Sequence, residues 1–71
     1  MKITLIILNM ASVEKEITEG ERLESILPND VRNAIHAGHL IVKDDRNTPI
    51  GEMYVPSREG EQITISLPSR F

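Results

Sequence analysis

The spacing of apolar residues differs in one segment of this chain, and that difference constrains the fold more than any other feature. Between residues 18 and 38 the apolar side chains recur every three or four positions, which is typical of an amphipathic helix. On either side of this segment the period is two, which is typical of strands with one buried face. The sequence therefore predicts a small α+β domain with one helical segment and several strands.

A proline divides the helical segment. At its start, Thr18 and Glu21 have the spacing of a capping box, in which each residue bonds to the backbone of the other. Pro28 has no N–H to donate and disfavours helical geometry at the residue before it. Asn29 or Asp30 is then predicted to cap a second helical turn. We expect one kinked helix or two short ones.

The helical segment is predicted to end at Gly38, which accepts the left-handed conformation that closes many helices. The apolar residues predicted to face the core from this segment are Leu23, Ile26, Leu27, Val31, Ala34 and Ile35.

Strands are predicted for residues 2–9, 12–18, 39–44, 52–55 and 61–68, separated by polar turns. The turn before the last strand is predicted to place Gly60 at positive φ. The side chains predicted to point inward are Ile3, Leu5, Ile7, Val13, Ile17, Ile63, Ile65 and Leu67. The predicted order of elements is β-β-α-β-β-β.

Length and composition predict one small domain over residues 1–71. A chain of this size buries only about 60% of its unfolded surface, so a homodimer is one way to supplement its core. The sequence has no cysteine, which excludes disulfides and thiolate sites. It shows no leader and no long apolar run, and we expect a cytoplasmic protein that does not enter a membrane.

Acidic residues are concentrated in one part of the chain. The net charge is −3, and residues 14–30 contain six acidic and two basic side chains, a local balance of −4. An acidic edge argues against nucleic acid as a partner, because binding to phosphates requires clustered Lys and Arg. It is either a solvated face or a protein-binding surface. The acidic residues assigned to protein binding are Glu14, Glu16, Glu21 and Glu24.

The turn and final strand have the form Gly-acidic-x-Ile-x-Ile, here Gly60, Glu61, Ile63 and Ile65. With the order of elements, this pattern resembles the β-grasp superfamily, which includes ubiquitin, sulfur carriers and TGS domains. The stretch from Ala34 to His39 and the pair Val55-Pro56 also resemble TGS domains. The resemblance implies a mixed sheet, with its first and last strands side by side at the centre and the helix across one face.

The carriers and conjugating proteins of that superfamily end in Gly-Gly. This sequence ends Pro68-Ser69-Arg70-Phe71, so we do not expect a carrier or conjugation function.

The sequence contains no pattern that predicts catalysis, a metal site or a cofactor. His36 and His39 are three residues apart, with Asp44 or Asp45 as a third ligand, but Gly38 separates them and no known ligand spacing is met. No glycine-rich loop precedes a helix, which argues against a nucleotide site. The two aromatic residues, Tyr54 and Phe71, offer little for stacking on bases. We therefore expect a protein that is not an enzyme.

A sheet covered by one helix leaves its second face open, and such an apolar patch is typical of an association surface. The residues predicted to form it are Ile6, Leu8, Ile41 and Tyr54. The favoured hypothesis is a non-catalytic interaction module, inhibitor or regulator that binds another protein through this face or the acidic edge. One form would be a phage-encoded inhibitor of a host protein. The alternative is an RNA- or ribosome-associated TGS-like domain.

Overall fold

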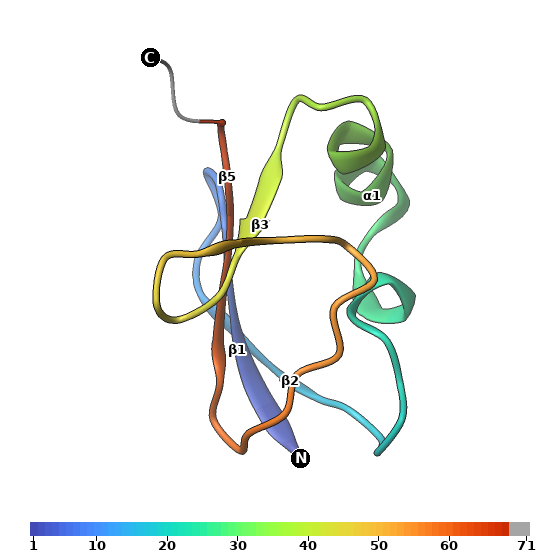
Figure 1. Ribbon diagram of the computed structural model, residues 1–71, viewed down its shortest axis with the longest axis vertical. Coiled ribbons are helices and arrows are strands. Elements are labelled where there is room, and N and C mark those ends of the chain that lie inside the picture. Colours follow the sequence, from blue (N-terminus) through green and yellow to red (C-terminus); the bar gives the residue numbers. More distant parts are fainter. Residues whose placement is uncertain (69–71) are drawn as a thin grey trace.

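The computed structural model describes residues 1–68, and Phe71 lies outside the described residues. Over these residues the chain forms a small α+β fold with a five-stranded mixed sheet and one α-helix, which agrees with the predicted class (Figure 1). The elements are β1 (Lys2–Ile7), β2 (Val13–Glu16), the 3₁₀ helix η1 (Leu23–Ile26), α1 (Asn29–His36), β3 (Ile41–Lys43), β4 (Pro49–Ile50) and β5 (Gln62–Ser66).

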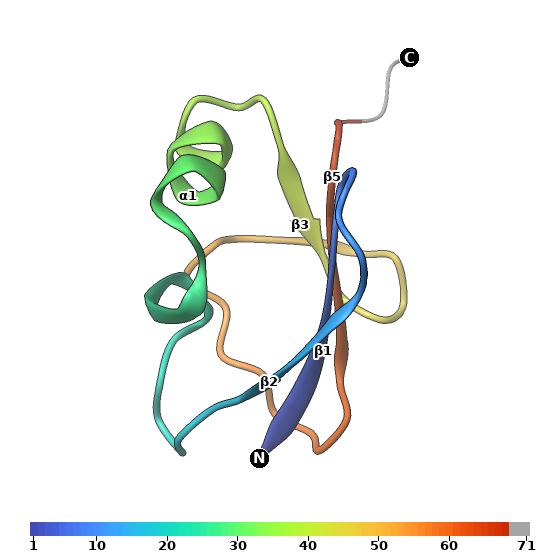
Figure 2. The same ribbon diagram turned by 180° about the vertical axis from the view of Figure 1, so that it is seen from behind.

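The strand order across the sheet is β2-β1-β5-β3-β4. The central strands β1 and β5 run parallel, with Leu5 opposite Ile63, and every other neighbouring pair is antiparallel. Both helices lie on the same side of the sheet in two opposite views (Figures 1 and 2). We call this side the covered face and the other side the open face.

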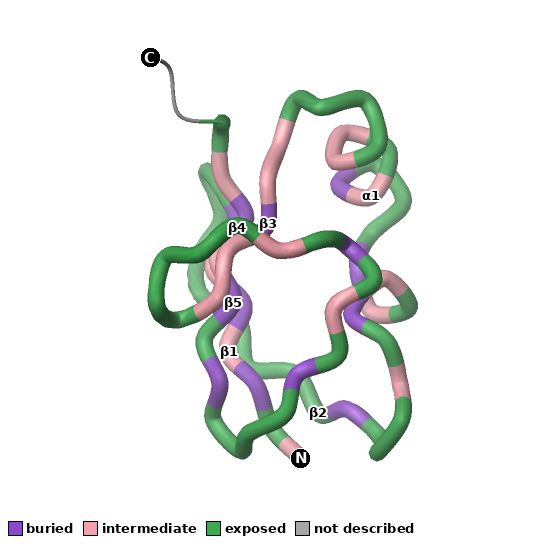
Figure 3. The backbone as a smooth tube through the Cα atoms, in the orientation of Figure 1, coloured by how far each residue is buried: buried purple, intermediate pink, exposed green. Residues whose placement is uncertain are grey.

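The core lies between the covered face and the helices (Figure 3). Alternate residues of β1 and β5 face it, as the period of two predicted. The buried apolar residues are Ile3, Leu5, Ile7, Ile17, Leu23, Leu27, Val31, Val42, Ile63 and Ile65. Ile26 and Ile35 are partly buried and pack against them.

The helical segment forms two separate helices, which resolves the alternative that the sequence left open. Leu27 and Pro28 between them are extended, with ψ angles of 141° and 151°. The predicted caps are wrong: Pro28 itself is the N-cap residue of α1, without a side-chain cap, and Asn29 begins the helix. Pro28 fits this position because the N–H groups at the start of a helix have no partner within the helix, so the N–H that proline lacks is not missed.

The predicted capping box forms only in part, and no helix follows it. The N–H of Thr18 donates to Oε1 of Glu21 over 3.2 Å, and the N–H of Glu21 donates to the backbone oxygen of Thr18 over 2.9 Å. The second bond closes a turn through Gly20, whose φ is +84°. The positive φ ends the turn before a helix can continue, and η1 begins later, at Leu23.

Gly38 ends α1 as predicted, with φ at +80°. The N–H of Gly38 donates to the oxygen of Ile35 and that of His39 to the oxygen of Ala34, over 3.0 Å and 2.9 Å. This pair of bonds is a Schellman motif, which satisfies carbonyls that the helix end would leave unpaired.

The strand predicted for residues 52–55 is wrong, and β4 lies earlier, at Pro49–Ile50. Oδ1 of Asp44 accepts the N–H groups of Arg46 and Thr48, each over 2.9 Å, so the loop after β3 closes tightly. Pairing therefore resumes at once, with Lys43 opposite Pro49. The N–H of Tyr54 then donates to the oxygen of Gly51 over 3.1 Å, and this turn removes residues 52–55 from the sheet.

Three residues near strand ends differ from their predicted environments. Leu67 is 62% exposed because β5 ends at Ser66, so its predicted inward position is wrong. Val13 is also exposed, because β2 lies at the edge of the sheet. β1 ends at Ile7, and Leu8 therefore belongs to the turn that follows.

Candidate functional site

The open face is defined by the strand register, because residues directly opposite each other in a sheet point to the same side. Thr4 lies opposite Glu14 of β2 and Gln62 of β5, and Thr64 lies opposite Ile6 of β1 and Lys43 of β3. The open face consists of Lys2, Thr4, Ile6, Glu14, Glu16, Ile41, Lys43, Pro49, Gln62, Thr64 and Ser66.

The predicted apolar patch on this face is interrupted by polar side chains. Ile6 lies opposite Thr64, and Ile41 lies opposite Ser66, so hydroxyl groups stand between the two isoleucines. Both isoleucines are only partly exposed. Leu8 follows the end of β1 and is 37% exposed, and its N–H donates to the oxygen of Ile65 over 2.8 Å. The structure thus places Ile6 on β1 and Ile41 on β3, on either side of β5, with Leu8 just beyond the end of β1. The surface that they share is mixed apolar and polar.

Tyr54 does not join the open face, so its predicted placement there is wrong. It packs against the core from the loop between β4 and β5, and its backbone oxygen accepts the N–H of Leu23 over 2.9 Å. Its hydroxyl group bonds to the carboxylate of Glu61. Burial, together with this bond, raises the pKa of Tyr54 to about 12. The turn at Gly51 redirects the chain toward the helices and carries Tyr54 with it.

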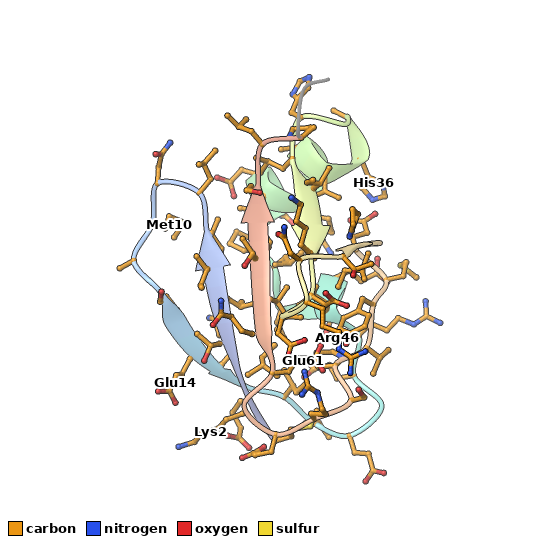
Figure 4. All side chains as sticks on the ribbon, turned by 60° about the vertical axis from the view of Figure 1, so that its left-hand side comes forward. Lys2, Met10, Glu14, His36, Arg46 and Glu61 are labelled. Atoms are coloured by element: carbon orange, nitrogen blue, oxygen red, sulfur yellow. The ribbon has the colours of Figure 1, made fainter. Side chains whose placement is uncertain are left out.

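The four acidic residues assigned to binding occupy two places. Glu14 and Glu16 lie on β2, and Glu14 projects outward on the same side of the molecule as Lys2 (Figure 4). Glu21 belongs to the turn before η1, and Glu24 belongs to η1, where its carboxylate lies 3.8 Å from Arg22. The acidic segment is therefore not one surface, and only its first part lies on the sheet.

Within the pair on β2, only Glu16 has an internal partner among the described residues. Its Oε1 lies 2.9 Å from the amino group of Met1. This hydrogen bond lowers the pKa of Glu16 and raises the pKa of the Met1 amino group. Within residues 1–68, Glu14 forms no ion pair.

The backbone of β2 has an unpaired outer edge. The N–H of Ile17 donates to the oxygen of Met1 over 2.8 Å, and the Met1 amino group donates to the oxygen of Ile17 over 3.2 Å. Bonded and non-bonded pairs alternate along an antiparallel ladder, so Lys15 also bonds to β1. Glu16 lies between these two bonded residues, and Glu14 lies between Lys15 and the next bonded residue, Val13. Their N–H and C=O groups therefore point away from β1, toward the outside of the sheet.

Glu61 is a buried carboxylate that the sequence pattern did not assign to a site. It is 3% exposed, at the start of β5, and accepts bonds from the hydroxyl group of Tyr54 and, over 3.2 Å, from the N–H of Ser57. Arg58 pairs with Asp45, and these two residues and Glu61 line a polar hollow of about 250 Å³. Both oxygens of Glu61 have donors, so this cluster closes the loop against the core. The feature of the sequence that points to this residue is its position directly after Gly60, in the turn before the last strand.

A second buried carboxylate belongs to Glu52, which is 8% exposed. Its Oε1 contacts Nε2 of His36 at the end of α1, and its Oε2 has no hydrogen-bond partner within the described residues. Across residues 1–68, no group of three or more His, Asp or Glu side chains is placed to hold a metal ion. The contact ties the loop after β4 to the helix.

A larger hollow of about 500 Å³ lies between the turn at residues 18–21 and the loop at residues 55–57. Apolar atoms of Ile17, Val55 and Pro56 form part of its wall. Glu19 and Glu21 also lie along its wall.

In the part of the chain that the structure describes, neither helix is long and apolar enough to cross a membrane. No protein-family model, curated protein or solved structure matches this chain.

Proposed function

We propose that this protein is a non-catalytic interaction module, of the kind used by small inhibitors and regulators, and that it binds another protein through its uncovered sheet. We also propose that the fold is of the β-grasp type. The support for the fold is the strand order β2-β1-β5-β3-β4 with a parallel central pair.

The observation that carries the functional proposal is the open face itself. Both helices lie on the other side of the sheet, and no described segment crosses the open face (Figures 1 and 2). Ile6 and Ile41 lie there among hydroxyl and charged side chains, with Leu8 at the rim. A mixed apolar and polar surface of this kind is the usual composition of an interface between proteins that also exist separately.

We do not propose catalysis as an alternative. The buried carboxylate of Glu61 has a hydrogen-bond donor for each oxygen and lies on the covered side. The RNA-binding alternative stays a prediction. A gel-shift assay tests it, because binding to phosphates must weaken steeply as salt is added.

The experiment that tests the proposal replaces Leu8 with Lys, which places a charge at the rim of the open face. The matched control is Met53→Lys, because Met53 is similarly exposed, at 46%, but lies in the loop after β4. Each protein is used to capture partners from a lysate of the source cells, and its own association is measured by analytical ultracentrifugation. We expect a partner, or a second copy of the chain, that binds wild type and Met53→Lys but not Leu8→Lys.

Circular dichroism of each variant shows whether the fold is intact. Equal complexes with Leu8→Lys and wild type would contradict binding at this rim. An unfolded Leu8→Lys variant would show instead that Leu8 belongs to the core.

A further inference from the structure

We infer that β2 is a docking strand, to which an extended segment of another protein with alternating Lys or Arg side chains is added as a sixth strand. The inference rests on the proposed function and names the class of partner.

The backbone of β2 has the groups that such an addition needs. The N–H and C=O groups of Glu14 and Glu16 point outward, so the edge offers two donors and two acceptors in register. All four residues of β2 are exposed, and β2 lies at one end of the strand order. Strand addition to a free sheet edge uses these main-chain bonds for affinity and alternate side chains for specificity.

The opposite edge of the sheet is a poorer template. β4 has only two residues, and one of them is Pro49, which has no N–H to donate. Short strands and prolines are common ways in which proteins block an edge. The sheet therefore presents one open edge rather than two.

Charge selects the partner. The residues of an added strand that bond to Glu14 and Glu16 point to the open face beside these two carboxylates. Glu14 has no ion pair within residues 1–68, and Glu16 faces only the Met1 amino group and its cross-strand neighbour Lys2. Basic side chains two residues apart therefore complement β2. A residue between them lies opposite Lys15, on the other side of the sheet, where a polar or acidic side chain fits.

The same charges exclude a second copy of β2 as the added strand. In a two-fold antiparallel pair, the outward bonds require Glu14 or Glu16 of one copy to lie opposite Glu14 or Glu16 of the other. The three possible registers therefore place Glu14 opposite Glu14, Glu16 opposite Glu16, or Glu14 opposite Glu16. The last register also places Lys15 opposite Lys15. Like charges directly opposite each other destabilise a sheet, so the occupant is a different protein.

The experiment uses the full chain and a short synthetic peptide in which lysine alternates with threonine, blocked at both ends. Binding is followed by nuclear magnetic resonance, with hydrogen exchange of the individual amides. We expect the exchange of the Glu14 and Glu16 amides to slow about tenfold or more at saturating peptide, because they gain acceptors. The amide of Lys15, already bonded to β1, should be unchanged.

Two comparisons separate strand addition from general charge attraction. A lysine peptide with methylated backbone nitrogens keeps its charge but loses its donors, and we expect it not to bind. Glu14→Lys should weaken binding of the lysine peptide about fivefold. Glu19→Lys is the matched control, because Glu19 is also exposed but lies outside β2. It should bind the lysine peptide like wild type, apart from a small loss that added salt removes.

The inference is overturned if the methylated peptide binds as well as the unmethylated one, if the Glu14 and Glu16 amides keep their exchange rates, or if millimolar lysine peptide does not bind. If the peptide fails while a Leu8-dependent partner is still captured, the proposed function stands without this inference. If both fail, the proposed function fails as well.

Discussion

The covered and open faces of the sheet are built from the same three inner strands, and both contain isoleucine. On the covered face, Ile63 and Ile65 of β5 are fully buried beneath the helices. On the open face, Thr64 and Ser66 of the same strand lie between Ile6 and Ile41. A β-branched side chain at a strand position therefore indicates a pleated surface, whereas burial depends on which face the helices cover.

The two faces should also differ most in what a mutation costs. Ile65→Ala removes a fully buried side chain from the covered face, and we expect it to lower the free energy of unfolding by about 2–5 kcal/mol. Its neighbour Thr64 lies on the open face, and Thr64→Ala should cost about 0.5 kcal/mol or less. Urea denaturation of both variants measures the difference. Equal losses would mean that the strand register is wrong.

The loop that closes the end of the covered face should contribute less. Tyr54→Phe removes the hydroxyl group that bonds to Glu61, and we expect a loss of about 1 kcal/mol at neutral pH. Denaturation at a fixed pH near 7 measures it. No loss would show that the hydroxyl group does not close this end of the core.

Tyr54 should also make stability depend on pH in the alkaline range. Its pKa rises from 10.0 to about 12 on folding, so the folded chain holds the phenol proton more tightly. The resulting stability is complete below pH 10 and is lost as the pH rises through 12. Between these values wild type should lose more stability than Tyr54→Phe. Parallel pH profiles for the two proteins would contradict this assignment.

The smallest effect is expected where the covered face ends. The alternation in β5 predicted that Leu67 faces the core, yet its side chain is 62% exposed. We expect Leu67→Ala to change the free energy of unfolding by less than about 0.5 kcal/mol. Ile63→Ala provides the contrast, because Ile63 comes four residues earlier in the sequence and is fully buried. A cost for Leu67→Ala near that of Ile63→Ala would extend the covered face beyond Ser66.

Local spacing predicted much of the fold but less of the candidate site. The inward residues of β1 and β5, the division at Pro28 and the positive φ of Gly38 and Gly60 were all predictable, because each depends on neighbours within a few residues. Of the residues assigned to the apolar patch, Ile6 and Ile41 lie on the open face, but Tyr54 lies with the core. Backbone hydrogen bonds of the loop after β4 hold Tyr54 against the core. No periodic pattern in the sequence predicts such bonds.

The sequence by itself determined the class of fold, the buried side of the central strands and the absence of cysteine chemistry, because periodicity and composition are local properties. The tertiary structure alone decided which strand lies at the free edge and which backbone groups point outward from it. It also brought the carboxylate of Glu61 to the hydroxyl group of Tyr54 and separated Glu14 and Glu16 from Glu21 and Glu24. The reason is physical: strand order and register are set by contacts between residues far apart in the chain, and a single strand's pattern is compatible with a central or an edge position.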